Sequence, residues 1–201
     1  MPFQLTLHQP EIPNNTGNIG RTCIATGCAL HLIRPFGFDT SVKALRRAGL
    51  DYWPRLAPTE HDDWEAYLRW LGSLSRDGAN STPESADRAL NNDSESRSTN
   101  GSESRSTLSP RMWLYTTKCA RPHWDVEIRP GDHLVFGKET AGLPDALLER
   151  HPDRLVSLPM VAGERSLNVA TAVCAAIYEG MRQCAARGEL VIGDDGRSIS
   201  P

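Results

Sequence analysis

Three polar, glycine-containing segments are the places where this 201-residue chain could carry chemistry. They read NNTGNIGR at residues 14–21, FGKETAGLP at 136–144 and LPMVAGERSLN at 158–168. Each is expected to follow a strand and to precede a helix. In open α/β sheets, ligands collect outside the carboxyl ends of the strands, where helix N-termini and free backbone N–H groups point outward. The three segments are therefore expected to face the same side of one sheet.

Several familiar kinds of site do not fit these segments. The first segment lacks the G-x-G-x-x-G spacing of a dinucleotide-binding loop, which argues against a nicotinamide-dependent oxidoreductase. GKET resembles the end of a phosphate-binding P-loop, but Glu139 stands where Ser or Thr would hold Mg²⁺. The histidines show no metal-ligand spacing such as H-E-x-x-H, and no Ser–His or Cys–His pair lies in a recognisable motif. The sequence therefore predicts no metal site.

Each segment also has a purely structural interpretation. Gly137 and Gly142 could serve only to permit tight turns, and Ser166 could only cap the helix that follows it. Glu139 could be a solvated loop carboxylate. Taken one at a time, the segments do not decide between a structural and a catalytic role.

Hydrophobic periodicity indicates the elements that position these segments. Apolar runs predict short strands at residues 3–7, 30–33, 112–116, 133–136 and 155–158. Apolar residues at three- and four-residue intervals predict helices at 19–27, 42–50, 64–74 and 167–187. Residues 11–20 are expected to form a loop. The length and the alternation of elements indicate a single α/β domain.

Two regions depart from globular composition. Residues 76–110 are rich in Ser, Asn, Asp, Glu and Arg, nearly lack large apolar residues, and repeat SESRST at 94–99 and 102–107. They are expected to form a disordered insert, because little apolar burial is available to offset the entropy of ordering. Residues 189–201 are expected to form a flexible tail. The domain would then span residues 1–188, interrupted by the insert.

Charge, cysteine content and hydropathy limit the possible partners and the cellular location of the protein. The net charge of -3 argues against binding nucleic acid through a strong general positive field, although the insert and the tail hold the acidic excess. The five cysteines form no C-x-x-C pair and are expected to be reduced and structural. The N-terminal residues do not follow a signal-peptide pattern and no run of about 18 apolar residues occurs, so a soluble cytoplasmic protein is expected.

Together and in this order, the three segments resemble the motifs of the SPOUT superfamily of RNA methyltransferases. The stretches that carry the resemblance are PEIPNNTGNIGR, FGKETAGLP and LPMVAGERSLNVATAV. RPFGFD at 34–39 and LRRAGLDYW at 45–53 further resemble the subgroup of tRNA (cytidine(34)-2′-O)-methyltransferases. The resemblance covers residues 3–75 and 111–187, and the chain departs from the subgroup at the insert and the tail.

The resemblance implies a fold and a cofactor. The fold would be an α/β domain with a parallel sheet flanked by helices and a C-terminal trefoil knot, which composition and spacing could not reveal. The cofactor would be S-adenosyl-L-methionine (SAM), bent among three knotted loops. The matching cofactor-binding positions in this chain are Tyr115, Thr116, Gly137, Glu139, Gly142, Leu158, Met160, Ser166 and Leu167. Backbone groups suit an adenine edge, and glycine allows their close approach.

The implied reaction is methylation of the ribose 2′-hydroxyl of the wobble nucleotide, cytidine or uridine 34, in tRNA. This hydroxyl is a weak nucleophile and the sulfonium is already activated, so catalysis needs in-line placement and help with the departing proton. The catalytic residues implied by the resemblance are Arg21, Asn15, Glu139, Ser166 and Asn168. A guanidinium has a pKa above about 12, so two roles stay open for Arg21: a deprotonated base, or a cation that binds the adjacent phosphate, which takes the proton.

The resemblance also implies partners. It predicts a homodimer whose active site lies at the subunit interface and to which the long C-terminal helix contributes. The predicted RNA contacts are Arg46, Arg47 and Arg165, with Arg34, Lys43, Arg55, Lys118 and Arg121 as weaker candidates. Two alternatives remain: a ribosomal RNA or another tRNA position as the target, and a knotted RNA-binding protein without catalysis. The presence of all the implied catalytic residues disfavours the second alternative.

Overall fold

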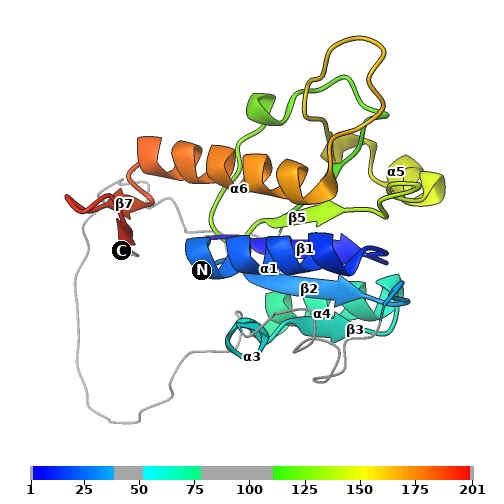
Figure 1. Ribbon diagram of the computed structural model, residues 1–201, viewed down its shortest axis with the longest axis horizontal. Coiled ribbons are helices and arrows are strands. Elements are labelled where there is room, and N and C mark those ends of the chain that lie inside the picture. Colours follow the sequence, from blue (N-terminus) through cyan, green and yellow to red (C-terminus); the bar gives the residue numbers. More distant parts are fainter. Residues whose placement is uncertain (1, 39–51, 78–110, 200–201) are drawn as a thin grey trace, which may run out of the picture.

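The computed structural model describes residues 2–38, 52–77 and 111–199, and its centre is a six-stranded sheet (Figure 1). The strands are β1 (Gln4–His8), β2 (Ala29–Ile33), β3 (Thr59–His61), β4 (Met112–Tyr115), β5 (His133–Phe136) and β6 (Leu155–Val156). Their order is β3-β2-β1-β5-β4-β6, and every neighbouring pair is parallel. The predicted α/β class with a parallel sheet flanked by helices is confirmed.

Helices cover both faces of this sheet. They are α1 (Pro13–Thr26), α3 (Trp53–Leu56), α4 (Trp64–Asp77), α5 (Asp145–Arg150) and α6 (Val169–Ala186). α1 and α6 pack against each other in front of the sheet in Figure 1. α4 covers the opposite face, where Tyr67 hydrogen-bonds to side chains of β1 and β5. Both faces of the strands are therefore buried, as is usual for parallel sheets.

The first polar segment is helical, so the prediction of a loop over residues 11–20 is wrong. α1 begins at Pro13, whose fixed φ and missing N–H suit the first helical position. The residue before it, Ile12, offers no side-chain cap, and the Glu139 carboxylate accepts its N–H at 3.2 Å instead. Glycine weakens a helix, and Gly20 lies where α1 meets α3: a Cβ there would lie 2.7 Å from Leu56 Cδ2, so that side chain would have to shift.

Other predicted elements are found with shifted ends. α6 begins at Val169, not at residue 167, because the Asn168 side chain accepts hydrogen bonds from two N–H groups of its first turn. β6 ends at Val156, since Ser157 makes only an isolated bridge with Pro122. Periodicity missed β3, α3 and α5, which are too short to repeat a pattern.

Several predictions concern segments at the edges of the described ranges. The helix predicted at 42–50 lies outside the described residues. α4 runs to Asp77 and so takes up the start of the predicted insert, whereas residues 78–110 are outside the described ranges. The predicted flexible tail contains a short antiparallel ribbon of β7 (Val191–Ile192) and β8 (Ser198–Ile199). Two 3-10 turns, η1 (His123–Asp125) and η2 (Pro152–Arg154), complete the described chain.

A buried polar network fills the space between the sheet and α4. His31 Nε2 lies 2.9 Å from Gln4 Oε1, and His31 Nδ1 lies 3.1 Å from His61 Nε2. The Tyr67 hydroxyl accepts from Thr6 and lies 2.7 Å from His133 Nδ1. If the side-chain oxygen of Gln4 accepts from His31 Nε2, the neutral His31 ring accepts at Nδ1 from His61. Burial favours this neutral form of the ring.

This histidine network makes the stability of the protein sensitive to acid. Burial lowers the pKa of His31 to about 3 and that of His133 to about 4, whereas both rings titrate near 6.5 when unfolded. The unfolded chain then binds more protons below pH 6.5, so stability is complete above that pH and is lost as the pH falls towards 4. We expect a loss of about 1.4 kcal/mol per pH unit for each of these two histidines.

Urea unfolding at pH 7, 6 and 5 measures this effect, in a range where carboxylates stay ionised. A His31→Asn variant is the control. Its unfolding free energy should fall less steeply with decreasing pH, by the contribution of the one proton that His31 binds on unfolding. The Asp62 carboxylate raises the pKa of His61 and so opposes the lowering by burial. His61 therefore contributes less to the acid sensitivity of the stability. An unfolding free energy that stays constant between pH 7 and 5 would contradict the prediction.

Candidate active site

A cavity of about 520 Å³ lies beyond the carboxyl ends of β4, β5 and β6. The segments that follow these strands and the start of α1 form its walls. All nine predicted cofactor-binding residues line it: Tyr115, Thr116, Gly137, Glu139, Gly142, Leu158, Met160, Ser166 and Leu167. Asn15, Arg165 and Asn168 line it as well. The structure therefore brings together residues that are up to 153 positions apart in the sequence.

The apolar part of the cavity is aromatic and aliphatic. The rings of Tyr115 and Phe136 are stacked, with centroids 4.5 Å apart and planes 15° apart. Leu158, Met160 and Leu167 supply aliphatic surface from the segment after β6. Burial raises the pKa of Tyr115, so its phenol stays protonated and cannot act as a base. This part of the cavity can bury a flat organic ring.

A tight turn after β5 forms another wall. The N–H of Lys138 donates to Gly142 O at 3.1 Å, and the N–H of Gly142 donates back to Lys138 O at 2.9 Å. Gly142 has a φ of 70°, a left-handed conformation that favours glycine. A Cβ at Gly137 would lie 2.0 Å from the carbonyl carbon of Gly142. The turn can fold back in this way only because residue 137 is glycine.

A chain of amide and carboxylate groups connects the three motif segments. Asn168 Nδ2 donates to Asn15 Oδ1 at 3.0 Å, and Asn15 Nδ2 donates to Glu139 Oε1 at 3.2 Å. Glu139 Oε2 also accepts the N–H of Glu11 at 2.8 Å. The carboxylate thus lies at the positive end of α1, where the helix dipole stabilises a negative charge. Asn15, Glu139 and Asn168 act first as a framework that fixes the cavity walls.

A second contact between the same two segments was not predicted. The Thr140 hydroxyl donates to Glu11 Oε2 at 2.7 Å, and this hydrogen bond lowers the pKa of the Glu11 carboxyl. Glu11 therefore binds the turn after β5 through its side chain while its own N–H binds Glu139. Both residues lie within the motif segments, but no spacing rule shows that residues so far apart in sequence pair with each other.

Asn168 has two roles that substitutions can separate. Its Oδ1 accepts the N–H groups of Ala170 and Thr171 and so caps α6, while its Nδ2 binds Asn15. Asn168→Ala removes both contacts and is expected to lower the unfolding free energy by about 1 kcal/mol. Asn168→Asp keeps the capping oxygen but turns a second oxygen towards Asn15, so stability should be retained while cofactor affinity falls.

Urea unfolding and calorimetric titration with the cofactor check this pair of variants. The aspartate variant should unfold within about 0.5 kcal/mol of the wild type, because aspartate caps helices as well as asparagine does. Equal cofactor affinity in the aspartate variant and the wild type would contradict the proposed framework role.

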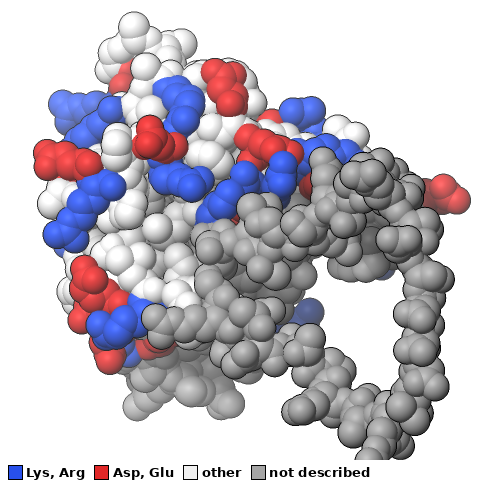
Figure 2. Space-filling model, turned by 180° about the vertical axis from the view of Figure 1, so that it is seen from behind, with Lys and Arg blue, Asp and Glu red and all other residues white. Residues whose placement is uncertain are grey.

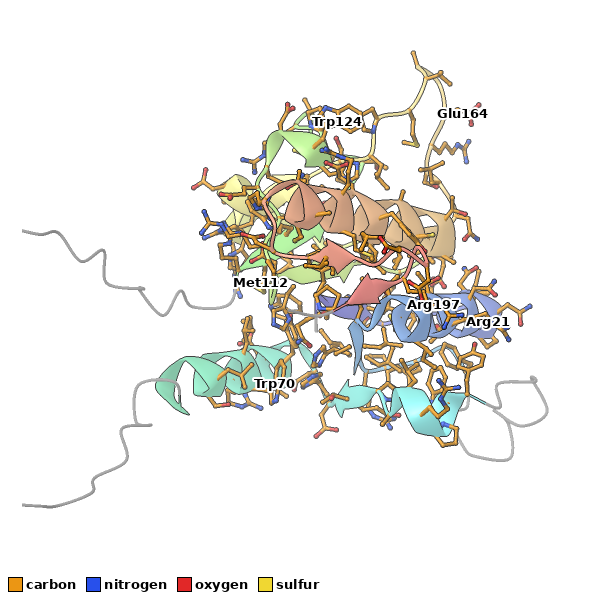
Figure 3. The ribbon with its side chains drawn as sticks, turned by 90° about the vertical axis from the view of Figure 1, so that its left-hand side faces the viewer. Arg21, Trp70, Met112, Trp124, Glu164 and Arg197 are labelled. Atoms are coloured by element: carbon orange, nitrogen blue, oxygen red, sulfur yellow. The ribbon has the colours of Figure 1, made fainter. Side chains whose placement is uncertain are left out.

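Arg21 is the one implied catalytic residue that does not line the cavity of its own chain. It lies six residues after Asn15 on α1 and is exposed. Its guanidinium carbon is 5.0 Å from the ring centroid of Tyr52. Figure 3 shows Arg21 projecting from α1, well separated from the loop that carries Glu164 beside the cavity. Ser166 by contrast is exposed at the cavity and free to contact a ligand.

The predicted RNA contacts differ in how they are placed. Arg165 is exposed and lines the cavity, whereas Arg46, Arg47 and Lys43 lie outside the described residues. Among the weaker candidates, Arg34 pairs with Glu60, Lys118 pairs with Asp145, and Arg121 binds backbone carbonyls beside β6. On the face in Figure 2 basic and acidic side chains are interspersed, so the described part of that face has no uniform positive charge.

Within residues 2–38, 52–77 and 111–199, no group of His, Cys, Asp and Glu could hold a metal ion. None of the helices described there has the length and apolar character needed to cross a membrane. All five cysteines are free thiols.

The fold and the cavity define an α/β protein that binds a small organic molecule beyond the carboxyl ends of its parallel strands. The sequence matches the SpoU rRNA Methylase family over residues 2–76 and 85–178, and the chain belongs to that family.

Individual relatives agree with this membership. A protein of Saccharophagus degradans called tRNA (cytidine(34)-2′-O)-methyltransferase is 37% identical over 182 residues, covering 90% of this chain and 95% of that protein. A structure described as giving insights into the 2-OH methylation of C/U34 on tRNA is 35% identical with a TM-score of 0.69, covering 92% and 97% of the two chains. AviRb of Streptomyces viridochromogenes, solved with AdoMet, shares the fold with a TM-score of 0.67 at 21% identity, covering 91% and 58%.

Proposed function

We propose that this protein transfers a methyl group from SAM to the ribose 2′-hydroxyl of nucleotide 34, cytidine or uridine, in tRNA. The observation that carries the proposal is the convergence of the three motif segments on one cavity, with Asn168, Asn15 and Glu139 hydrogen-bonded in series. Membership of the family and relatives named for this reaction over nearly the whole chain support the choice of substrate.

The residues of the cavity fit the cofactor. The stacked rings of Tyr115 and Phe136 and the side chains of Leu158 and Met160 offer an apolar slot of the kind that an adenine ring requires. Glycine at residue 137 lets the turn from Lys138 to Gly142 fold back tightly, and this turn offers backbone groups at the cavity wall. When bound, SAM supplies a methyl group on a sulfonium, which a ribose oxygen can attack in line without a metal.

Two tasks are left to the protein: orientation of the ribose and acceptance of its proton. We assign the first task to Ser166 and Asn168, because both side chains line the cavity. Glu139 is engaged at both carboxylate oxygens, so it holds the walls and does not take the proton. Arg21 is our choice for the remaining task, either as a base or by binding the phosphate that receives the proton.

The distance of Arg21 from the cavity of its own chain favours a shared site. We infer a homodimer in which Arg21 of one subunit reaches the cavity of the other, with α6 at the contact. Exposed apolar side chains on α6 and the C-terminal ribbon, among them Tyr178 and Ile192, agree with a surface that is covered in an assembly. The trefoil knot, the domain limits at 1–188 and the cytoplasmic location stay predictions.

Transfer of labelled methyl tests the function. The substrate is total tRNA that lacks the 2′-O-methyl group at position 34, and Arg21→Ala is assayed beside the wild type, with products mapped by nuclease digestion. Label on ribose 34 that disappears in the variant supports both the substrate and the role of Arg21. Label on ribosomal RNA but not on tRNA would favour the other target that the family name suggests. Cofactor binding without label on any RNA would point to a protein that has lost catalysis.

A further inference from the structure

We infer that Tyr52 is a positioning residue that holds the Arg21 guanidinium in place for RNA. This inference rests on the proposed function, because it assigns a task to the residue that we place at the ribose or its phosphate. The ring of Tyr52 lies under the guanidinium, with the Arg21 carbon 5.0 Å from the ring centroid.

The side chain of Tyr52 is fixed by a hydrogen bond of its hydroxyl and by burial of its ring. Its hydroxyl donates to the backbone oxygen of Gly17 at 2.5 Å, one helical turn before Arg21 on the same face of α1. Only 9% of Tyr52 is exposed. The ring packs beside Gly20 of α1, where a Cβ would lie 3.4 Å from Tyr52 Cε2. The ring is therefore a rigid platform attached to the helix that carries Arg21.

The contact restricts Arg21 without using its hydrogen-bonding groups. Within the described residues Arg21 makes no hydrogen bond and no ion pair, and the Tyr52 ring is the contact recorded for its guanidinium. A contact with the π-face of a ring takes up none of the five N–H groups of the guanidinium as hydrogen-bond donors. This arrangement suits bidentate binding of a phosphate, because the rotamer entropy of a long side chain is lost before RNA arrives.

The experiment separates the ring, the hydroxyl and general packing. Tyr52→Leu removes the ring, and Tyr52→Phe keeps it without the hydroxyl. Trp53→Leu removes a neighbouring aromatic ring that packs near Gly20 in the same α1–α3 contact, while the Arg21 guanidinium lies over Tyr52. Tyr52→Leu is expected to lower kcat about tenfold with the KM for SAM unchanged. Tyr52→Phe should stay within about threefold of wild type. Trp53→Leu should change the melting temperature but not kcat.

Two further measurements decide how the effect arises. In an Arg21→Ala background, Tyr52→Leu should cause no additional loss of kcat, and an equal loss in both backgrounds would overturn the inference. Relaxation of the Arg21 Nε–H measured by ¹⁵N NMR should show increased motion in Tyr52→Leu, and unchanged motion would also overturn it. The NMR result does not depend on turnover, so a failure of the proposed function, seen as full activity in Arg21→Ala, is distinguishable from a failure of this inference.

Discussion

A Gly137→Ala variant is expected to lose cofactor binding, with a Kd at least about 100-fold weaker than that of the wild type, and to lose methyl transfer with it. The added Cβ would lie 2.0 Å from the Gly142 carbonyl carbon and 2.2 Å from the Leu143 nitrogen. Both are backbone atoms, so no side-chain rotation relieves the overlap and the turn from Lys138 to Gly142 must move. That turn forms part of the cavity wall and carries Glu139.

Calorimetric titration with SAM measures the effect directly. Gly72→Ala is the matched control, since Gly72 lies in α4 with open space around its Cβ position and far from the cavity motifs. Alanine is the better helix former there, so the control should bind the cofactor as the wild type does and be slightly more stable. Cofactor affinity within about threefold of wild type in Gly137→Ala would show that this turn does not form the binding site.

Much of the sheet could be predicted because its strands are short apolar runs that end at polar motif segments. Strands β1, β2, β4 and β5 lie within one residue of the predicted ranges, and their segments converge as the α/β rule requires. α1 was predicted to start too late, because its first two turns are mostly polar and contain Gly17 and Gly20. Its start is stabilised by Glu139, which lies 127 positions from Ile12, and local periodicity holds no information about such a pairing.

The site, like the sheet, could be predicted from the sequence only in part. The types and order of the motif residues predicted which side chains line the cavity, and the structure places Asn15, Glu139 and Asn168 in one hydrogen-bonded series there. The sequence did not indicate that Glu139 would be occupied by backbone N–H groups, nor that Glu11 and Thr140 would connect the segments. These are consequences of tertiary packing, and they give Glu139 a structural contact beside the catalytic role that the resemblance implies.

The position of Arg21 leads to the prediction that most directly tests the shared site. Arg21→Ala alone is expected to lower kcat at least about 100-fold, because help with the departing proton is lost. Gly137→Ala alone should be equally inactive, but for lack of cofactor. If Arg21 serves the cavity of the partner subunit, a dimer that contains one chain of each kind has one complete site. An equal mixture after subunit exchange should then recover about a quarter of wild-type activity, since half the dimers are mixed.

Differently tagged chains allow the mixed dimer to be purified and assayed by methyl transfer to tRNA. The control is a mixed dimer of Gly137→Ala with a chain that carries both Arg21→Ala and Gly137→Ala, in which neither cavity binds the cofactor, so no complete site can form. Activity in the first mixed dimer and none in the second places Arg21 across the interface. An inactive first mixed dimer, with both chains folded and associated, would instead require α1 to bring Arg21 to the cavity of its own chain when RNA binds.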